Sequence, residues 1–163
     1  MAQTKKKCAQ GKPKSDQPSQ AQVAYVALLS ATDKLKSLFE SLCAPFDITG
    51  QQYNVLRILR GAGPDGLPTL TIAQRMIETT PGITRMIDRL ESKGLVEREI
   101  RSRDRRCVYC RITPKGLDLL KLLDQPCDES NHAAFRGLSA AELQQLTALL
   151  VKTRKAHESE PKS

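Results

Sequence analysis

The stretch TTPGITRMIDRLESKGLVEREIRSRDRRCVYCRIT, residues 79–113, decides the expected fold. Its first half has the period of an amphipathic helix, because apolar residues recur at i, i+3, i+4 and i+7. The inward stripe consists of Ile83, Met86, Ile87 and Leu90, and the outward face of Thr84, Arg85, Asp88 and Arg89. One face of this helix is therefore expected to pack on a core while the other meets solvent.

After Gly94 the period changes from helical to twofold, which is typical of half-buried strands. One strand face carries Val96, Arg98 and Ile100, and the face of a second strand carries Val108, Cys110 and Ile112. Residues 101–106 between them hold four arginines and one aspartate and cannot be buried. The pattern predicts a β-hairpin with a basic tip.

The segment before this helix predicts a second short helix. Residues 61–68 are rich in Gly and Pro and are expected to form a loop, followed by a very short strand at Thr69 and Leu70. Thr71 is the expected N-cap of a helix over 72–77, whose residues Ile72, Ala73, Met76 and Ile77 should face inward, and Pro81 suits the first turn of the next helix. Two short helices joined by a few residues are a helix-turn-helix, which places its second helix in a DNA major groove.

Longer helices are predicted on both sides of this unit. Residues 19–43 are apolar on more than one face, so this helix needs two packing partners, and Pro45 ends it before a new helix capped by Thr49. A further helix starts at Thr113 and Pro114, and Pro126 is expected to kink or break it. Ser139 and Glu142 form a capping box for the last helix.

Composition narrows the class of protein. The 163 residues suit one domain with extended ends, and 26 Lys and Arg against 18 Asp and Glu favour a polyanionic partner. The sequence has neither an apolar stretch of membrane-spanning length nor a secretory signal, so a cytoplasmic location without membrane association is the default expectation. Residues 1–18 combine lysines with Gln, Ser, Gly and Pro, which predicts a disordered basic arm.

Three motifs resemble the MarR family of winged helix-turn-helix transcription regulators. They are the D-R-L-E-x-K-G-L-V run at 88–96, D-R-R at 104–106 and T-P-K-G at 113–116. The resemblance extends by helix pattern over residues 19–157. It implies a mainly α fold with a small β-hairpin wing, in which a winged domain at 49–113 lies between dimerisation helices at 19–45 and 114–157, with a tail at 158–163.

The same resemblance implies a function. Family members are homodimers that bind a pseudo-palindromic operator in double-stranded DNA, most often as repressors, and many release it when a small aromatic or phenolic effector binds. The first and last helices of the two subunits would intertwine, which accounts for the two-sided helix at 19–43. No residue of the sequence identifies the operator, the effector or the regulated genes.

The candidate DNA-binding residues lie on the recognition helix and in the wing. Arg85 and Arg89 are four residues apart on the outward face, where guanidinium groups can contact guanine edges or phosphates, unless they only pair with neighbours such as Asp88. A wing arginine can enter the minor groove, and the family resemblance gives Asp104 the role of orienting it. The full set is Thr79, Thr80, Thr84, Arg85, Arg89, Arg101, Arg103, Arg105 and Arg106. Gly82 leaves one position of the usual contact surface without a side chain.

Five cysteines raise a second possibility, a thiol-based redox sensor. Cys107 and Cys110 have C-x-x-C spacing, but residues three apart on a strand point to opposite faces, which argues against a shared metal or a disulfide. Cys110 is expected to be a small core residue. Cys43 and Cys127 lie near the expected dimer junction and are the candidate redox residues.

Neither a catalytic cluster nor a cofactor motif is present in the sequence, so an enzyme, a metal site and a bound cofactor are not expected. A third possibility remains a winged-helix protein-interaction module without specific DNA binding, in which the basic wing serves only solubility.

Overall fold

A computed structural model of the chain describes residues 17–78, 81–100 and 108–158. The chain forms two compact units, residues 1–34 and 35–163, and each is described by itself. The first unit contains the start of helix α1 (Gln20–Cys43). A capping box begins this helix, because Ser19 Oγ accepts a bond from Gln22 N–H (3.2 Å) and Ser19 N–H donates to Gln22 Oε1 (2.8 Å). The predicted helix over 19–43 is thus confirmed.

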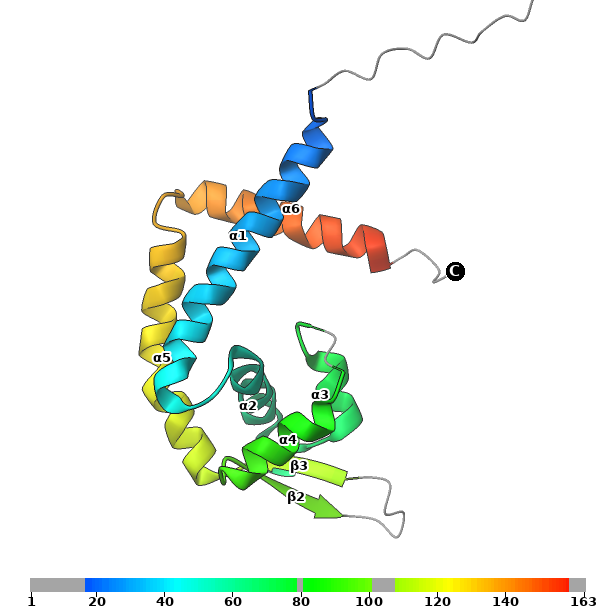
Figure 1. Cartoon of the computed structure of the whole chain (residues 1–163), viewed down its shortest axis with the longest axis vertical. Helices are drawn as coiled ribbons and strands as arrows, with labels where there is room; N and C mark the ends of the chain where they lie inside the picture. The colour runs from blue at the N-terminus through cyan, green and yellow to red at the C-terminus, as the bar shows by residue number, and fades with distance from the viewer. Residues whose placement is uncertain (1–16, 79–80, 101–107, 159–163) are drawn as a thin grey trace, which may run out of the picture. The chain divides into compact units, whose positions relative to one another are not determined.

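The second unit begins within α1 and contains all other elements (Figure 1). In chain order they are η1 (Ala44–Phe46), α2 (Gly50–Ala62), η2 (Gly63–Asp65), β1 (Leu67–Pro68), α3 (Thr69–Arg75), α4 (Ile83–Ser92), β2 (Val96–Ile100), β3 (Val108–Ile112), α5 (Pro114–Ala134) and α6 (Ala140–Glu158). The fold is mainly helical with a small antiparallel sheet, as the sequence predicted.

The core of this unit lies where α2, α3, α4 and the start of α5 meet the sheet. The fully buried residues come from each of these elements, and they include Leu56, Leu59, Ile72, Ile87, Leu90, Cys110, Leu120 and Leu123. The predicted inward stripe of α4 is confirmed, because Ile87 and Leu90 have no exposed surface and Ile83 and Met86 are half-buried against them. Cys110 is confirmed as a core residue.

The sheet has the strand order β1-β3-β2, with both pairs antiparallel. Val96 pairs with Ile112 and Arg98 with Cys110, so the residues that were predicted to share a face on each strand lie opposite one another in the hairpin. Leu67 pairs with Cys110 and Pro68 with Tyr109 on the other side of β3. The third strand therefore comes from a segment that the sequence assigned to a loop.

This pairing corrects the prediction for residues 69–77. The short strand is Leu67–Pro68, not Thr69 and Leu70, and the helix that follows is Thr69–Arg75, without a side-chain cap from Thr71. Met76 has an extended conformation (ψ 142°), so the helix ends before it. Ile77 is 87% exposed and does not face inward. With β1 paired to β3, the strand lies two residues, and the start of the helix three residues, closer to the N-terminus than predicted.

Hydroxyl caps also fix the starts of three helices in the second unit. Thr49 and Gln52 form a capping box on α2, and Ser139 and Glu142 form one on α6 as predicted. Thr113 Oγ1 accepts a bond from Gly116 N–H (3.1 Å) and donates to the Gly94 carbonyl (2.7 Å). One threonine hydroxyl thus joins the end of the sheet, the start of α5 and the turn after α4.

The expected break at Pro126 and the expected place of Pro81 were both wrong. Helix α5 is continuous through Pro126, so the proline does not break it, although it removes one backbone donor. Helix α4 begins at Ile83, so Pro81 lies in the preceding turn and not in the first helical turn.

Gly116 gives a test of the packing between α5 and the sheet. A Cβ atom at this position would lie 2.4 Å from the Leu95 carbonyl oxygen, a backbone atom that cannot move aside. We expect Gly116→Ala to lower the free energy of unfolding by about 1–3 kcal/mol.

The matched control is Gly61→Ala, because the space around Gly61 in α2 is empty and alanine favours helix by about 0.5–1 kcal/mol. Urea unfolding followed by circular dichroism at one protein concentration measures both. Equal stability of the two variants would contradict the close approach.

Candidate nucleic-acid interface

Helix α4 presents a polar face of basic and hydroxyl residues. Thr84, Arg85 and Arg89 are exposed, whereas Ile87 and Leu90 beneath them are fully buried. The turn before the helix uses Gly82 at φ 94°, a left-handed conformation that side-chain-bearing residues rarely adopt. Gly82 is therefore required by the backbone, and the missing side chain on the contact surface is a consequence of the turn.

Several of the predicted site residues are not placed. Thr79 and Thr80, the wing arginines Arg101, Arg103, Arg105 and Arg106, and Asp104 lie outside the described residues. The structure therefore brings together only Thr84, Arg85 and Arg89 on one exposed helix face.

Arg98 holds α4 on the sheet, and the sequence analysis did not give it this role. From β2, its guanidinium group bonds to the Thr84 carbonyl (3.1 Å) and forms ion pairs with Asp88 (2.6 Å) and Glu91 (3.3 Å). Desolvation alone would lower the pKa of Arg98, but the hydrogen bond that it donates to Asp88 and the negative charges of Asp88 and Glu91 raise the pKa above its usual value. The sequence does contain an indication of this role, because Arg98 alternates with Val96 and Ile100 on the strand face that is expected to pack inward.

The ion pair also resolves the alternative in which Asp88 binds Arg85 or Arg89. Asp88 pairs with Arg98 across the gap between helix and sheet. Because Arg98 neutralises this carboxylate, Asp88 repels a DNA phosphate less strongly than an unpaired carboxylate would.

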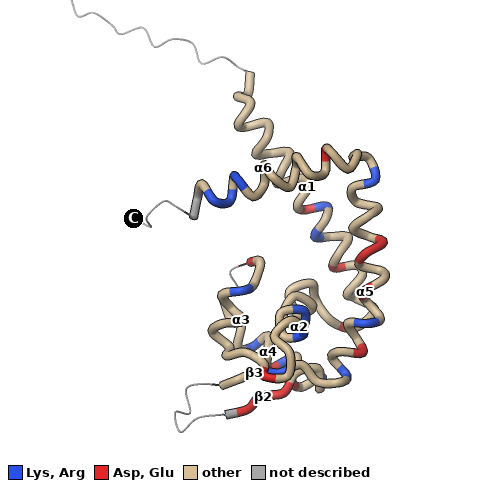
Figure 2. The backbone as a smooth tube through the Cα atoms, turned by 180° about the vertical axis from the view of Figure 1, so that it is seen from behind, with Lys and Arg blue, Asp and Glu red and all other residues tan. Residues whose placement is uncertain are grey.

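The outer face of the hairpin carries acidic residues that are partly neutralised. Glu97 and Glu99 on β2 are exposed, and Arg111 on β3 forms an ion pair with Glu99. Figure 2 shows the acidic residues of β2 in red. Because two acidic and two basic residues balance on β2 and β3, these strands contribute little net attraction for phosphate.

The two candidate redox cysteines lie in the core. Cys43 is fully buried and Cys127 is 6% exposed, and both are free thiols. Burial, then the neighbouring Cys127 and Glu40, raises the pKa of Cys43 to about 11. A sensing cysteine needs the opposite, a low pKa and access to oxidant. Within the described residues, clusters of His, Cys, Asp and Glu that could hold a metal ion are absent.

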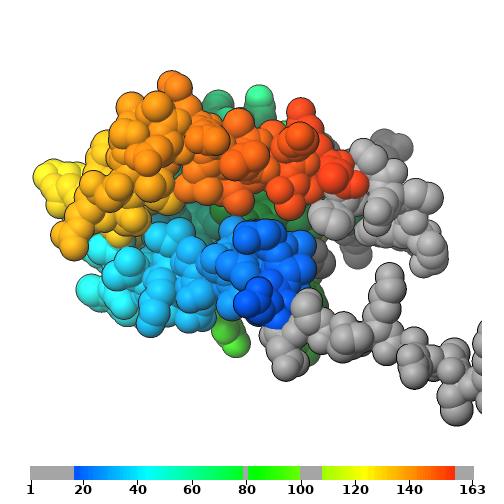
Figure 3. Space-filling model, turned by 90° about the horizontal axis from the view of Figure 1, so that it is seen from above, coloured from blue at the N-terminus to red at the C-terminus, as the bar shows by residue number. Residues whose placement is uncertain are grey.

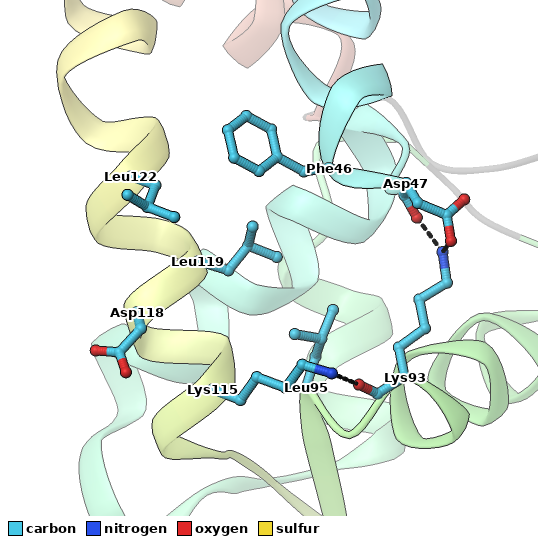
Figure 4. Close-up of a pocket in the computed structure, with 8 residues that line it drawn as sticks. All are labelled: Phe46, Asp47, Lys93, Leu95, Lys115, Asp118, Leu119 and Leu122. Carbon is cyan, nitrogen blue, oxygen red and sulfur yellow. Dashed lines mark hydrogen bonds and ion pairs between the residues drawn. The ribbon is translucent and has the colours of Figure 1, made fainter.

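Two cavities lie in the second unit. One of about 430 Å³ opens between the end of α4 and the start of α5 (Figure 4). It is lined by Phe46, Asp47, Lys93, Leu95, Lys115, Asp118, Leu119 and Leu122. The other, of about 590 Å³, is polar and lies along α2 and α5 near Tyr53 and Arg57. The first combines apolar walls with two lysines at its rim.

Large apolar side chains are exposed on several elements. Among the described side chains of helix α6 (orange to red in Figure 3), none is buried, and all except the half-buried Leu146 are exposed. The exposed large apolar residues are Val23, Tyr25, Val26, Leu28 and Leu29 in the first unit, and Leu35, Leu38, Leu70, Ile77, Leu122, Leu138, Leu143, Leu149, Leu150 and Val151 in the second. Surfaces of this kind mark sites of association. Within the described residues, the helices are too short or too polar to cross a membrane.

Comparisons of the sequence and of the structure with known proteins match the same family. A model of the MarR family matches residues 48–108. A MarR transcription factor from Planctomyces limnophilus is 40% identical, with a TM-score of 0.66, over 82% of this chain and 96% of that one. A mutant MarR from E. coli in complex with operator DNA is 27% identical, with a TM-score of 0.72, over 80% and 93%.

A third structure, BpsR from Bordetella bronchiseptica, was solved to explain how 6-hydroxynicotinic acid regulates its DNA binding. It is 22% identical, with a TM-score of 0.72, over 85% of this chain and 98% of that one. At this identity the likeness concerns the fold alone.

The buried thiols lead to a prediction on reactivity. With a pKa of about 11 in place of 9.0, Cys43 has about one hundredth of the thiolate of an ordinary cysteine near neutral pH. We expect iodoacetamide at pH 8 to label Cys43 and Cys127 at least tenfold more slowly in the folded protein than in urea. Peptide mass spectrometry measures each site. Rapid labelling of either cysteine in the folded state would favour the redox-sensor hypothesis.

Proposed function

We propose that this chain, which belongs to the MarR family of DNA-binding transcription regulators, recognises a pseudo-palindromic operator as a homodimer and represses the genes beside it. The observation that supports this most directly is the exposed basic face of α4. Arg85 and Arg89 lie over a fully buried apolar stripe, so the core determines which way they point.

Residues on α4 would provide sequence recognition. Arginine forms paired bonds with guanine in the major groove, and each such contact discriminates by about 1–3 kcal/mol. Thr84, one position before Arg85, would bond to a phosphate or contact a thymine methyl group. Thr79 and Thr80, which precede the helix in sequence, are proposed as further phosphate contacts.

The wing would supply attraction to DNA that does not depend on the base sequence. Residues 101–106 carry Arg101, Arg103, Arg105 and Arg106, and a wing arginine in a narrow minor groove meets concentrated negative potential. Asp104 would orient its neighbours and not touch DNA, because phosphate repels a carboxylate. This part of the proposal rests on sequence and family resemblance.

A homodimer accounts for the exposed apolar residues of α1, α5 and α6. Packing within its own chain stabilises α6 little, because none of its described side chains is buried. Obligate dimer interfaces resemble a hydrophobic core divided between two chains. Two identical recognition helices related by a twofold axis would then contact half-sites about one DNA turn, roughly 34 Å, apart.

Binding to selected DNA tests the proposal. Sites enriched from random double-stranded DNA should contain an inverted repeat, and Arg85→Ala should weaken binding to them about tenfold to a hundredfold, while binding to scrambled DNA changes little. Fluorescence anisotropy at fixed salt measures both.

The matched control is Arg136→Ala, which removes the same charge from an exposed position outside α4. Sedimentation should give twice the chain mass of 18.1 kDa for each variant. Enrichment without any common sequence would favour a protein-interaction module, and a single-chain mass would contradict the homodimer.

A small aromatic or phenolic acid is the proposed effector. The 430 Å³ cavity has walls of Leu95 and Leu119 for a ring, and Lys93 and Lys115 at its rim for a carboxylate. We expect 4-hydroxybenzoate at millimolar concentration to weaken operator binding in the same assay, and benzylamine, which carries the opposite charge, to have no effect. Equal responses to both compounds would contradict a charge-selective site.

A further inference from the structure

The C-terminal end of the recognition helix and the residue that closes the segment before it, Glu78, are both joined to one short segment of the chain. This segment, residues 36–51, comprises the last turns of α1, the turn η1 and the start of α2, and we call it the corner. Its bonds to the recognition segment, residues 78–93, involve side chains that the DNA-contact proposal does not use.

On the N-terminal side the leading link is made by Glu78, which lies between α3 and α4 and directly precedes residues 79–80, which are outside the described residues. Its carboxylate forms an ion pair with Lys36 on α1 and accepts a bond from Gln51 Nε2 on α2 (3.2 Å). Lys36, followed by Gln51, holds the pKa of Glu78 below its usual value. One carboxylate therefore joins three elements of the fold.

At the trailing end the link is made by Lys93, which caps α4. Its ammonium group forms an ion pair with Asp47 Oδ2 (2.9 Å) and also donates to the main-chain carbonyl of Asp47 (Figure 4). Asp47 has a left-handed backbone (φ 55°), the only such residue besides glycine among the described residues. Lys115 Nζ in turn donates to the Lys93 carbonyl (2.8 Å), which ties the same turn to α5.

We propose that the corner positions the recognition helix by holding its C-terminal end and the residue that closes the segment before it, through Lys36 and Gln51 to Glu78 and through Asp47 to Lys93. This inference rests on the proposed function, because positioning has an effect only if α4 contacts DNA. Lys36, Gln51 and Asp47 are positioning residues and do not touch DNA themselves. Since Lys36 lies on the helix that is proposed to dimerise, the same links make the placement of α4 depend on the placement of α1.

The energetics favour a positioning role over a stabilising one. Lys36 and Glu78 are about half exposed (57% and 41% of the side chain), and Asp47 is 93% exposed. Exposed ion pairs add little to the stability of a fold. Sequence-specific binding is more sensitive, because a small displacement of α4 affects every base contact at once.

The leading link offers a test in which charge and position predict opposite results. Lys36→Met removes a cation and Glu78→Gln removes an anion, so electrostatics alone would make the first variant bind DNA more weakly and the second more tightly. Positioning predicts that both variants lose about threefold to tenfold in the ratio of selected-site to scrambled-site affinity. The exchanged pair K36E/E78K should restore the ratio to within about twofold.

The trailing link is tested independently with Asp47→Asn and Lys93→Met, for which the same loss of ratio is expected. The control is Lys121→Met, which breaks an ion pair with Asp118 that lies on α5 alone. Thermal unfolding and sedimentation should be unchanged in every variant, and hydrogen exchange of the amides of residues 83–92 should be faster in the four that break a link.

Two results would overturn the inference. One is a Glu78→Gln variant that keeps or improves the wild-type ratio, and the other is an exchanged pair as weak as the single variants. A wild-type protein that prefers no DNA sequence would instead refute the proposed function. The two failures are therefore distinguishable in one set of measurements.

Discussion

The contact between Arg98 and α4 is the interaction on which the DNA-binding face depends. One guanidinium group bonds to a backbone carbonyl and two carboxylates spaced along the helix, at Thr84, Asp88 and Glu91. Apolar packing of Ile87 and Leu90 fixes the distance of α4 from the core, but apolar contact is not directional. The bonds from Arg98 add direction, because each requires a defined geometry. The helix is therefore fixed in rotation as well as in depth.

The sequence predicted the elements that have a clear period or a capping side chain. The stripe of α4, the hairpin and the capping box at Ser139 were all correct, since each depends on residues close in sequence. The errors lie where distant residues decide. Leu67 and Pro68 form a strand because β3 offers them backbone partners, and their own sequence reads as a loop. Pro126 remains helical within α5, although its own effect is to remove a donor.

The candidate site likewise has features that neighbouring residues decide and features that distant residues decide. Exposure of Thr84, Arg85 and Arg89 could be predicted, because the helical period alone places them opposite the apolar stripe. The partners of Asp88, Glu78 and Lys93 could not, because each bond joins residues 10 to 46 positions apart: Arg98 for Asp88, Lys36 for Glu78 and Asp47 for Lys93. Charge pairing at such separations is specified only by the fold. Sequence thus indicated which residues of α4 are exposed but not which residues hold the helix in place.

Lys93 connects the two proposals on regulation and positioning. Its side chain pairs with Asp47 at the corner, and it also lines the cavity that is proposed for an acidic effector. A ligand carboxylate in that cavity would compete with Asp47 for the ammonium group and so weaken the trailing link of α4. By linkage, operator DNA that favours the intact link must weaken effector binding by the same factor. The ion pair between Lys93 and Asp47 would then be intact when the operator is bound and broken when it is released. Because Asp47 is exposed, this ion pair is weak enough for a small ligand to break.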